Sequence, residues 1–248
     1  VAGMAAMLAG ICSGFITGFL QTKMGVDSLL AGIIVNTALY SINIAAMGNS
    51  SLLNMNKTET VFTKMKTLLA GTFLEKQSVL IVSLIAVVLV ILFLSLFLKT
   101  KLGLAIRATG NNPDMVRSSS INPAFTTIIG LCVSNAFTGL SGCLLAQSQK
   151  SVNIDIGTGM VTVALASLLI GGVFMRKGKI TAKAIGVVIG AIVFRLVYTV
   201  ALRFNMPASM LKLVSSVIVI IAISGPYLKS KYPEFKRRLD HNKARRAA

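Results

Sequence analysis

Seven stretches of mostly apolar residues divide this chain, and they constrain its fold more than any other feature. They are 1–21, 28–48, 78–98, 124–146, 156–174, 182–203 and 208–228. A helix rises about 1.5 Å per residue, so about 20 residues cross the ~30 Å hydrocarbon core of a bilayer. Backbone polar groups must be satisfied internally in lipid, and a continuous apolar run does this as a helix. The sequence therefore predicts an all-α fold, a polytopic transmembrane helix bundle of about seven spans.

Two of these stretches carry further expectations. Glycines crowd both ends of the fifth, 156–174, so this span is expected to be broken or only partly spanning. The first begins without Met, inside an apolar run, which indicates a fragment truncated at its N-terminus. We expect one transmembrane domain, 1–228, followed by a basic tail, 229–248.

The basic residues are distributed unevenly between the loops, and this distribution predicts an orientation. The net charge is +18, and 16 of the 25 Lys and Arg residues lie in 99–122, 175–183 and 229–248. Alternating spans place these three segments on one side, which the positive-inside rule makes the cytoplasm. The C-terminus is then cytoplasmic. Nucleic acid is not an expected partner, because aromatic platforms and basic grooves are missing.

One outer loop carries a helical pattern of its own. In loop 49–77, apolar residues recur at helical spacing from Val61 to Leu69. A short amphipathic helix at the membrane interface is therefore expected there.

The chain lacks the residues that would drive transport or catalysis alone. The seven Asp and Glu residues lie in loops, at helix ends or in the tail, whereas ion-driven carriers place a carboxylate inside a span. Gly172 and Gly178-Lys179 do not have Walker A spacing. The three cysteines lie in apolar runs and the one histidine, His241, lies in the tail. We expect no catalytic residues, no metal and no cofactor.

Polar side chains inside the predicted spans are candidates for a solute path. Arg195 lies eight residues before Arg203 in the sixth span. Burying an arginine costs about 2.5–3.5 kcal/mol on insertion scales, so a partner is expected. Arg195 either faces an anionic group of the solute, or reaches the interface or carbonyls of a neighbouring helix. Six other polar side chains in the spans could either contact the solute or form hydrogen bonds between helices. They are Asn36, Asn43, Ser134, Asn135, Thr138 and Tyr198.

The polar stretch 103–123 lies between two spans on the predicted cytoplasmic side. Asn112-Pro113-Asp114 is typical of a turn followed by a helix start, and Asn122-Pro123 of a second helix start. The pattern predicts two short helices with a sharp break, lying on the inner face of the membrane. An ordinary amphipathic loop is the alternative.

Residues 107–117 (Arg-Ala-Thr-Gly-Asn-Asn-Pro-Asp-Met-Val-Arg) resemble the coupling-helix motif of ABC importer permeases of the ribose and branched-chain amino acid type. Leu168-Leu169-Ile170-Gly171-Gly172 resembles a later segment of that family. Further stretches resemble the tryptophan/tyrosine-type subgroup: 18–23 with 29–33 and 39–43, 134–136 with 144–147, and 194–196 with 206–208 and 211–213. A departure is Asp27-Ser28, where that subgroup has consecutive prolines.

The resemblance implies a function and a set of partners. The chain would be the permease subunit of a bacterial ABC importer in the cell (inner) membrane, and not an enzyme. Its solute would be a small molecule, with an aromatic amino acid or a related compound as the candidate. An extracytoplasmic binding protein would deliver it. A second permease subunit, as in a homodimer, and cytosolic ATPase subunits would complete the assembly. The residues implied in ATPase coupling are Arg107, Gly110, Asn111, Pro113, Asp114 and Arg117. A stand-alone secondary carrier or channel is the alternative function.

Overall fold

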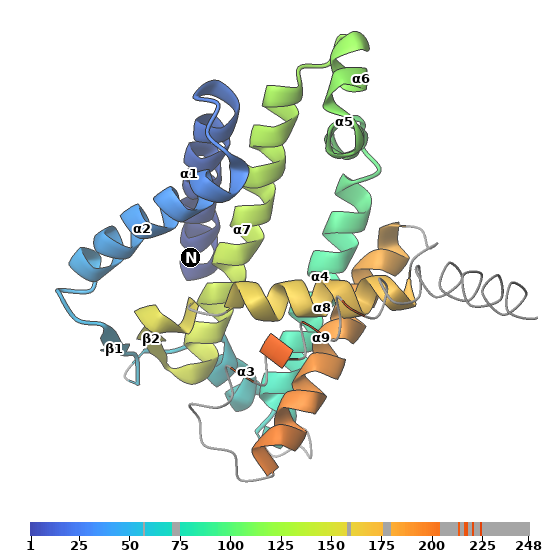
Figure 1. The fold of residues 1–248 in the computed structure, drawn as a ribbon. Coiled ribbons are helices and arrows are strands. Elements are labelled where there is room, and N and C mark those ends of the chain that lie inside the picture. Colours follow the sequence, from blue (N-terminus) through green and yellow to red (C-terminus); the bar gives the residue numbers. More distant parts are fainter. Residues whose placement is uncertain are drawn as a thin grey trace, which may run out of the picture. The chain divides into compact units, whose positions relative to one another are not determined.

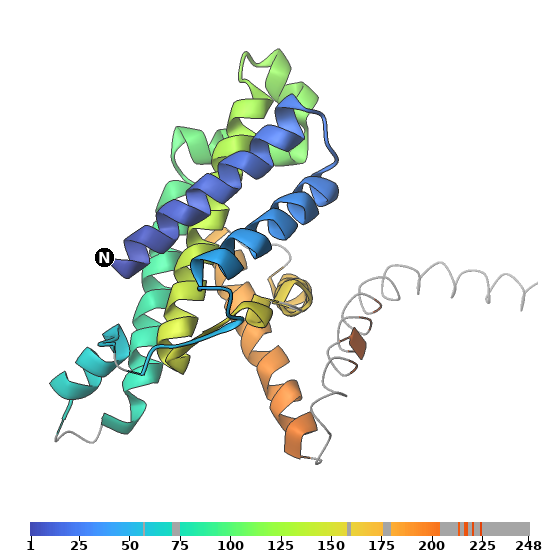
Figure 2. The same ribbon diagram turned by 90° about the vertical axis from the view of Figure 1, so that its left-hand side faces the viewer.

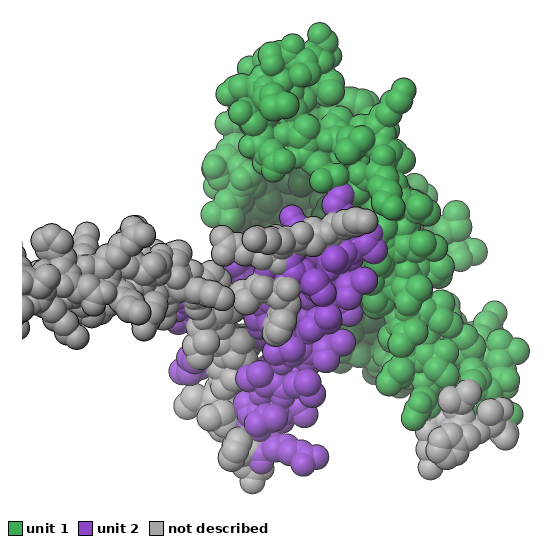
Figure 3. Space-filling model, turned by 90° about the vertical axis from the view of Figure 1, so that its right-hand side faces the viewer, with its two compact units in different colours: residues 1–155 green, residues 156–248 purple. Residues whose placement is uncertain are grey.

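The computed structural model describes residues 1–56, 58–70, 75–157, 160–175 and 180–203, together with positions 213, 216, 217, 220 and 224. The chain divides into two compact units, residues 1–155 and 156–248, which Figure 3 colours separately. Each unit is described by itself.

The elements of the first unit follow one another in a nearly all-helical order (Figure 1). They are α1 (Ala2–Lys23), α2 (Ser28–Ala46), β1 (Leu52–Asn54), α3 (Val61–Leu68), η1 (Glu75–Gln77), α4 (Ser78–Phe97), α5 (Lys101–Asn111), α6 (Pro113–Ser118), α7 (Pro123–Gln149) and β2 (Ser151–Asn153). The 3-10 turn η2 (Ile154–Gly157) leads into the second unit, which holds α8 (Met160–Phe174) and α9 (Ile180–Arg203).

The predicted all-α, polytopic bundle is confirmed. Within the described residues, five helices are long and apolar enough to cross a membrane: α1, α2, α4, α7 and Ile180–Ala201 of α9. The fifth predicted span, 156–174, contains a shorter apolar helix, Met160–Gly172. The seventh, 208–228, lies outside the described residues except for five positions, and the tail 229–248 lies wholly outside them.

Helices α1 and α7 form the centre of the first unit and lie side by side in Figures 1 and 2. A Cβ atom added at Gly10 would clash with the Asn135 carbonyl oxygen, and one added at Gly14 would lie 2.5 Å from the Leu131 carbonyl oxygen. Glycine at these places lets the two backbones touch. Gly10 contacts Asn135 and Gly14 contacts Leu131, so residue numbers rise along α1 while they fall along α7. The two helices are therefore antiparallel. The glycines of α1 therefore form its contact face with α7.

The two ends of α7 are built differently. At one end, α5 and α6 pack against its start, and at the other, β1 and β2 pair antiparallel with Leu53 opposite Val152 (Figure 2). This strand pair joins two loops that are about 100 residues apart, a contact that the sequence did not predict. The predicted amphipathic helix is confirmed as α3, whose Phe62 is buried.

Many apolar side chains of the long helices are exposed. On α4, Leu80 is 60% exposed, Leu84 57% and Leu89 59%. Such surfaces suit lipid, which is as apolar as leucine and does not drive helices together. One contact that α4 does make with α7 is between the rings of Phe93 and Phe137, whose centroids lie 5.5 Å apart.

The second unit repeats the close packing of α1 and α7 in a helix hairpin. Helices α8 and α9 pack together, and added Cβ atoms at Gly171 and Gly190 would clash with carbonyl oxygens of Gly186 and Ser167. Glycine at 171, 186 and 190 therefore lets the backbones of α8 and α9 touch.

Candidate functional site: the coupling segment and the cavity at the far end of α7

The coupling segment, residues 103–123, folds as the sequence predicts, into two short helices with a sharp break. Asn112 caps α6, because its Oδ1 accepts from the backbone N–H groups of Asp114 (3.0 Å) and Met115 (3.1 Å). Pro113 occupies the first turn of α6. Asn122 repeats this arrangement at the start of α7, where its Oδ1 accepts from the Ala124 N–H at 3.0 Å.

All six predicted coupling residues lie on this segment and are exposed. Asp114 lies in the first turn of α6 and Arg117 in its last, where each charge complements the helix dipole. Arg107, Gly110 and Asn111 lie on the neighbouring α5. Between Asp114 and Arg117 on α6, Met115 is 63% exposed although its side chain is apolar. The segment thus presents separated charges around an apolar side chain, a surface suited to contact with another protein.

The buried side of the coupling segment packs against the start of α7. Val116 of α6 is 2% exposed, and a Cβ atom added at Gly130 of α7 would lie 3.3 Å from Ile106 Cγ2 of α5. Thr109 of α5 and Thr126 of α7 share a hydrogen bond of 2.8 Å between their hydroxyl groups. Sequence reasoning missed these two threonines, because neither carries charge or belongs to a turn.

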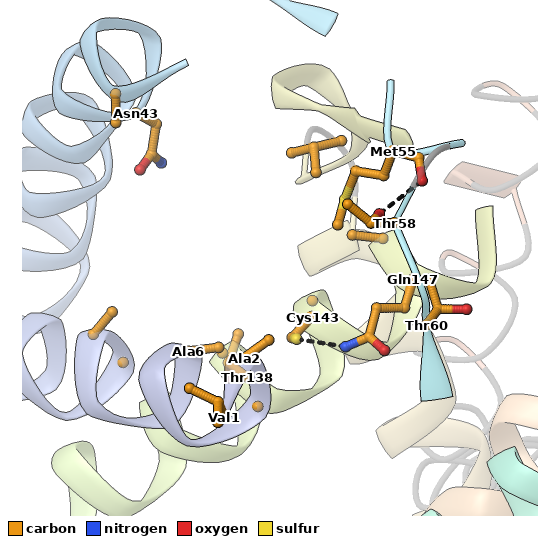
Figure 4. A pocket seen from close by; sticks show the side chains of 18 of the residues that line it. Val1, Ala2, Ala6, Asn43, Met55, Thr58, Thr60, Thr138, Cys143 and Gln147 are labelled. Carbon is orange, nitrogen blue, oxygen red and sulfur yellow. Dashed lines mark hydrogen bonds between the residues drawn. The ribbon is translucent and has the colours of Figure 1, made fainter. Parts of the chain in front are cut away.

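A cavity of about 1060 Å³ lies at the other end of the first unit, near β1 and β2. Its walls come from the start of α1, the end of α2, the end of α7 and the segments 55–64 and 152–154 (Figure 4). Most lining side chains are small or apolar. The polar side chains lining it include Ser13, Asn43, Thr60, Asn135, Thr138 and Gln147.

The amide side chains around this cavity have different roles. In Figure 4, Asn43 of α2 lies across the open space from Cys143 and Gln147 of α7. Gln147 is 8% exposed, its Oε1 accepts from the Val61 N–H at 3.1 Å, and its Nε2 donates to Cys143 Sγ at 3.1 Å. Asn135 Nδ2 donates to the Leu131 carbonyl oxygen of its own helix at 3.1 Å. Gln147 therefore holds α3 against α7, a role that the sequence did not indicate.

The charged groups near the cavity are exposed. Lys64 Nζ and Glu59 Oε2 form an ion pair at 3.6 Å, and both residues line the cavity. Their side chains are 70% and 78% exposed, so this pair contributes little to stability. Among the described residues, no group of three or more His, Cys, Asp or Glu side chains could hold a metal ion.

The four predicted path residues are not all brought together. Asn135 lines the cavity, whereas Asn36 is exposed on α2 and does not line it. Arg195 and Tyr198 belong to α9 of the second unit. There Tyr198 stacks on Phe194 with ring centroids 6.4 Å apart, and Arg195 is exposed.

Comparison of the sequence with known proteins shows the family to which the chain belongs. Residues 1–223 match the family described as branched-chain amino acid transport system, permease component. The chain belongs to this permease family. A tyrosine transport system permease protein of Clostridioides difficile (strain R20291) is 31% identical over 220 residues, covering 89% of this chain and 70% of the relative.

More distant relatives of this permease share the transport class. A nucleoside ABC transporter permease protein of Lactococcus lactis is 25% identical and covers 86% of the chain and 60% of the relative. An autoinducer 2 import system permease protein of Salmonella typhimurium is 24% identical, covering 84% and 57%. No solved structure matches this permease. It is an integral membrane protein, the permease subunit of an ABC importer, and such subunits work with ATPase and binding-protein partners.

Proposed function

We propose that this permease forms the path for an aromatic amino acid, or a related small solute, and is driven by a separate ATPase. The single observation that carries the proposal is the likeness to a tyrosine transport permease over 89% of the chain. Hydrolysis is assigned to another polypeptide, because the sequence has no Walker A motif. The permease itself then performs no chemistry on the solute.

The ATPase subunit is proposed to dock on the exposed face of α5 and α6. Arg107, Asp114 and Arg117 offer charges of both signs there, around the exposed Met115. The basic loops support an orientation with this face and the C-terminus in the cytoplasm. The cavity between α1, α2 and α7 is then on the outer side, where a binding protein delivers the solute.

The outer cavity is proposed to be part of the solute path. Its volume of about 1060 Å³ exceeds what one amino acid occupies, and its walls combine apolar surface with a few amide and hydroxyl groups. Asn135 is the wall residue proposed to contact the solute. Asn36, Arg195 and Tyr198 remain candidates for the same path, with Arg195 as the partner of a carboxylate and Tyr198 as a stacking surface. A homodimer is proposed as the working assembly.

The first test is identification of what the permease binds. The full-length protein would be tagged, extracted gently from native membranes and analysed by mass spectrometry. We expect a stoichiometric ATPase subunit that carries a Walker A motif, and we expect reconstituted complexes to take up labelled tyrosine only with ATP. Uptake by the permease alone, driven by an ion gradient, would instead support a secondary carrier.

A second test concerns Arg195. We expect Arg195→Ala to reduce tyrosine uptake more than Arg195→Lys, because lysine keeps the positive charge that a carboxylate needs. A membrane-inserted, correctly folded protein in both variants is the control. Near-native uptake in both would assign Arg195 a structural role.

A further inference from the structure

The contact between Thr109 and Thr126 differs from every other side-chain hydrogen bond of α5 and α6 in the described part of the chain. Those others join residues two to four positions apart and stay local. The Thr109 and Thr126 hydroxyl groups lie 2.8 Å apart and join α5 to α7 across 17 positions. The contact is sheltered, because Thr126 is 2% exposed.

The hydrogen-bond partners make this contact two-directional. Each hydroxyl carries one hydrogen. If Thr109 donates to Thr126, then Thr126 can donate to the Pro123 carbonyl oxygen, which lies 2.9 Å away. If Thr126 donates instead, Thr109 can donate to the Ala105 carbonyl oxygen at 2.8 Å. In either direction both hydroxyl groups donate to an acceptor, so the contact leaves no buried donor unpaired.

The position of the pair connects two parts of the permease. Thr109 lies between Arg107 and Gly110 of the exposed docking face, and Thr126 lies in the first turn of α7. Beside the pair is a cavity of about 620 Å³, lined on the α1 side by Gln21 and Thr22. Space on that side leaves α5 room to move against α1, whereas the hydroxyl pair ties it to α7.

We infer that the Thr109–Thr126 hydroxyl pair is a positioning contact that transmits movement of the coupling segment to α7. Movement of α7 would carry α1 with it, because their backbones touch at Gly10 and Gly14. The cavity at the far end of both helices would then change shape. This inference rests on the proposed function, in which an ATPase moves the coupling segment.

The test replaces each threonine by valine, which keeps the shape but removes the hydroxyl. The remaining threonine still has a carbonyl partner in its own helix, so no buried donor is left unpaired and the fold should persist. In reconstituted complexes, Thr109→Val and Thr126→Val should each raise the ATP hydrolysed per labelled tyrosine about fivefold. This is the factor that one net hydrogen bond represents. The double variant should be no worse than either single variant, because all three lose the same bond.

Three matched variants separate positioning from packing. Thr109→Ser and Thr126→Ser keep the hydroxyl and should restore the wild-type ratio. Thr22 lines the same small cavity, but its hydroxyl donates to the Gly18 carbonyl oxygen of its own helix at 2.7 Å. Thr22→Val should therefore leave the ratio unchanged. A wild-type ratio in both valine variants at 109 and 126 would overturn the inference.

A second readout needs no transported solute. Cys143 lines the outer cavity, whereas Cys12 and Cys132 do not. In a Cys12→Ala, Cys132→Ala background, trapping the ATPase with vanadate should change the maleimide labelling rate of Cys143, and Thr109→Val should reduce that change about fivefold. If the vanadate-induced change in the labelling rate is as large in Thr109→Val as in the wild type, the inference about the hydroxyl pair is overturned while the proposed function stands. A wild-type permease that binds no ATPase would overturn the proposed function and, with it, this inference.

Discussion

Helix α7 meets its two neighbours in different ways. Against α1 it has a backbone contact, in which added Cβ atoms at Gly10, Gly14 and Gly139 would meet carbonyl oxygens. Against α5 it has side-chain contacts, the Thr109–Thr126 hydroxyl pair among them. The α1 contact is close and extends along the helix, whereas the α5 contact is confined to the first turns of α7.

This difference indicates which parts can move relative to each other. Backbones in van der Waals contact lose many weak attractions at once when they separate, because dispersion falls steeply with distance. Helices α1 and α7 should therefore move as one body. A contact through side chains can tilt while its hydrogen bond is kept, so α5 and α6 are expected to change their angle to α7 while the Thr109–Thr126 pair still moves the start of α7 with them.

The largest effect is expected from breaking the α1–α7 contact. A Gly10→Ala, Gly14→Ala double variant would place two Cβ atoms against α7 backbone, since the one at position 14 lies 2.5 Å from the Leu131 carbonyl oxygen. Backbone cannot move aside as a flexible side chain can. We expect a loss of about 3 kcal/mol or more, measured as a lower melting temperature in detergent.

The matched control places alanine where there is space. Around Gly32 of α2 and Gly142 of α7, an added Cβ would meet nothing within 4 Å. A Gly32→Ala, Gly142→Ala double variant should be as stable as the wild type or gain up to about 1 kcal/mol per site from helix propensity. Equal melting temperatures in the two double variants would contradict the close-contact interpretation.

The next effect concerns function and lowers stability only slightly, because the reversed charges oppose the dipole of the short helix α6. Asp114→Arg combined with Arg117→Glu reverses the charges on the exposed surface of α6. We expect ATP-driven uptake to fall about tenfold or more, because like charges would oppose those of the docked ATPase. The melting temperature should change little, since both side chains are exposed. Wild-type uptake in this double variant would show that docking does not depend on these charges.

The sequence predicts the parts of this permease that depend on local physics. Apolar run length placed the long helices within a few residues of their bounds, and the asparagine–proline pairs at 112–113 and 122–123 placed the helix starts. The departure at Asp27-Ser28 is also explained locally, because Asp27 Oδ1 caps α2 by accepting from the Leu29 N–H at 2.9 Å.

Contacts between distant segments were not predictable in the same way. Glycine spacing on α1 indicates a face for close packing, but not that α7 is the helix that packs there. The three-residue strands β1 and β2 are too short to show an alternating pattern. The larger cavity is assembled from five segments of the chain, so Asn135 could be proposed from its polarity while its separation from Asn36 could not.

A smaller effect is expected at the C-terminal end of α7, beside the cavity. Gln147→Leu would keep the bulk of the side chain but remove the acceptor for the Val61 N–H, which lies at the start of α3. Because Val61 is half-exposed and its N–H can reach water, the loss is that of one net hydrogen bond, about 1 kcal/mol. Hydrogen exchange of residues 60–68 should become faster, while exchange across α1 remains unchanged. Unchanged exchange at α3 would mean that the β1–β2 pair alone holds this loop.

The smallest effect is expected at the break between α5 and α6. Asn112→Ala removes the cap of the two N–H groups that Asn112 Oδ1 now satisfies, at a cost of about 1 kcal/mol. Asn112→Asp should preserve the cap and add a negative charge near the helix N-terminus, which stabilises it slightly. Because α6 has six residues and Asn112 is exposed, the loss should be local, with a melting temperature close to the wild type. If α6 moves as a unit, Asn112→Ala should raise the ATP used per tyrosine, and Asn112→Asp should not. An equal rise in both would mean that the asparagine side chain contacts the ATPase directly, because aspartate keeps the cap but not the amide group.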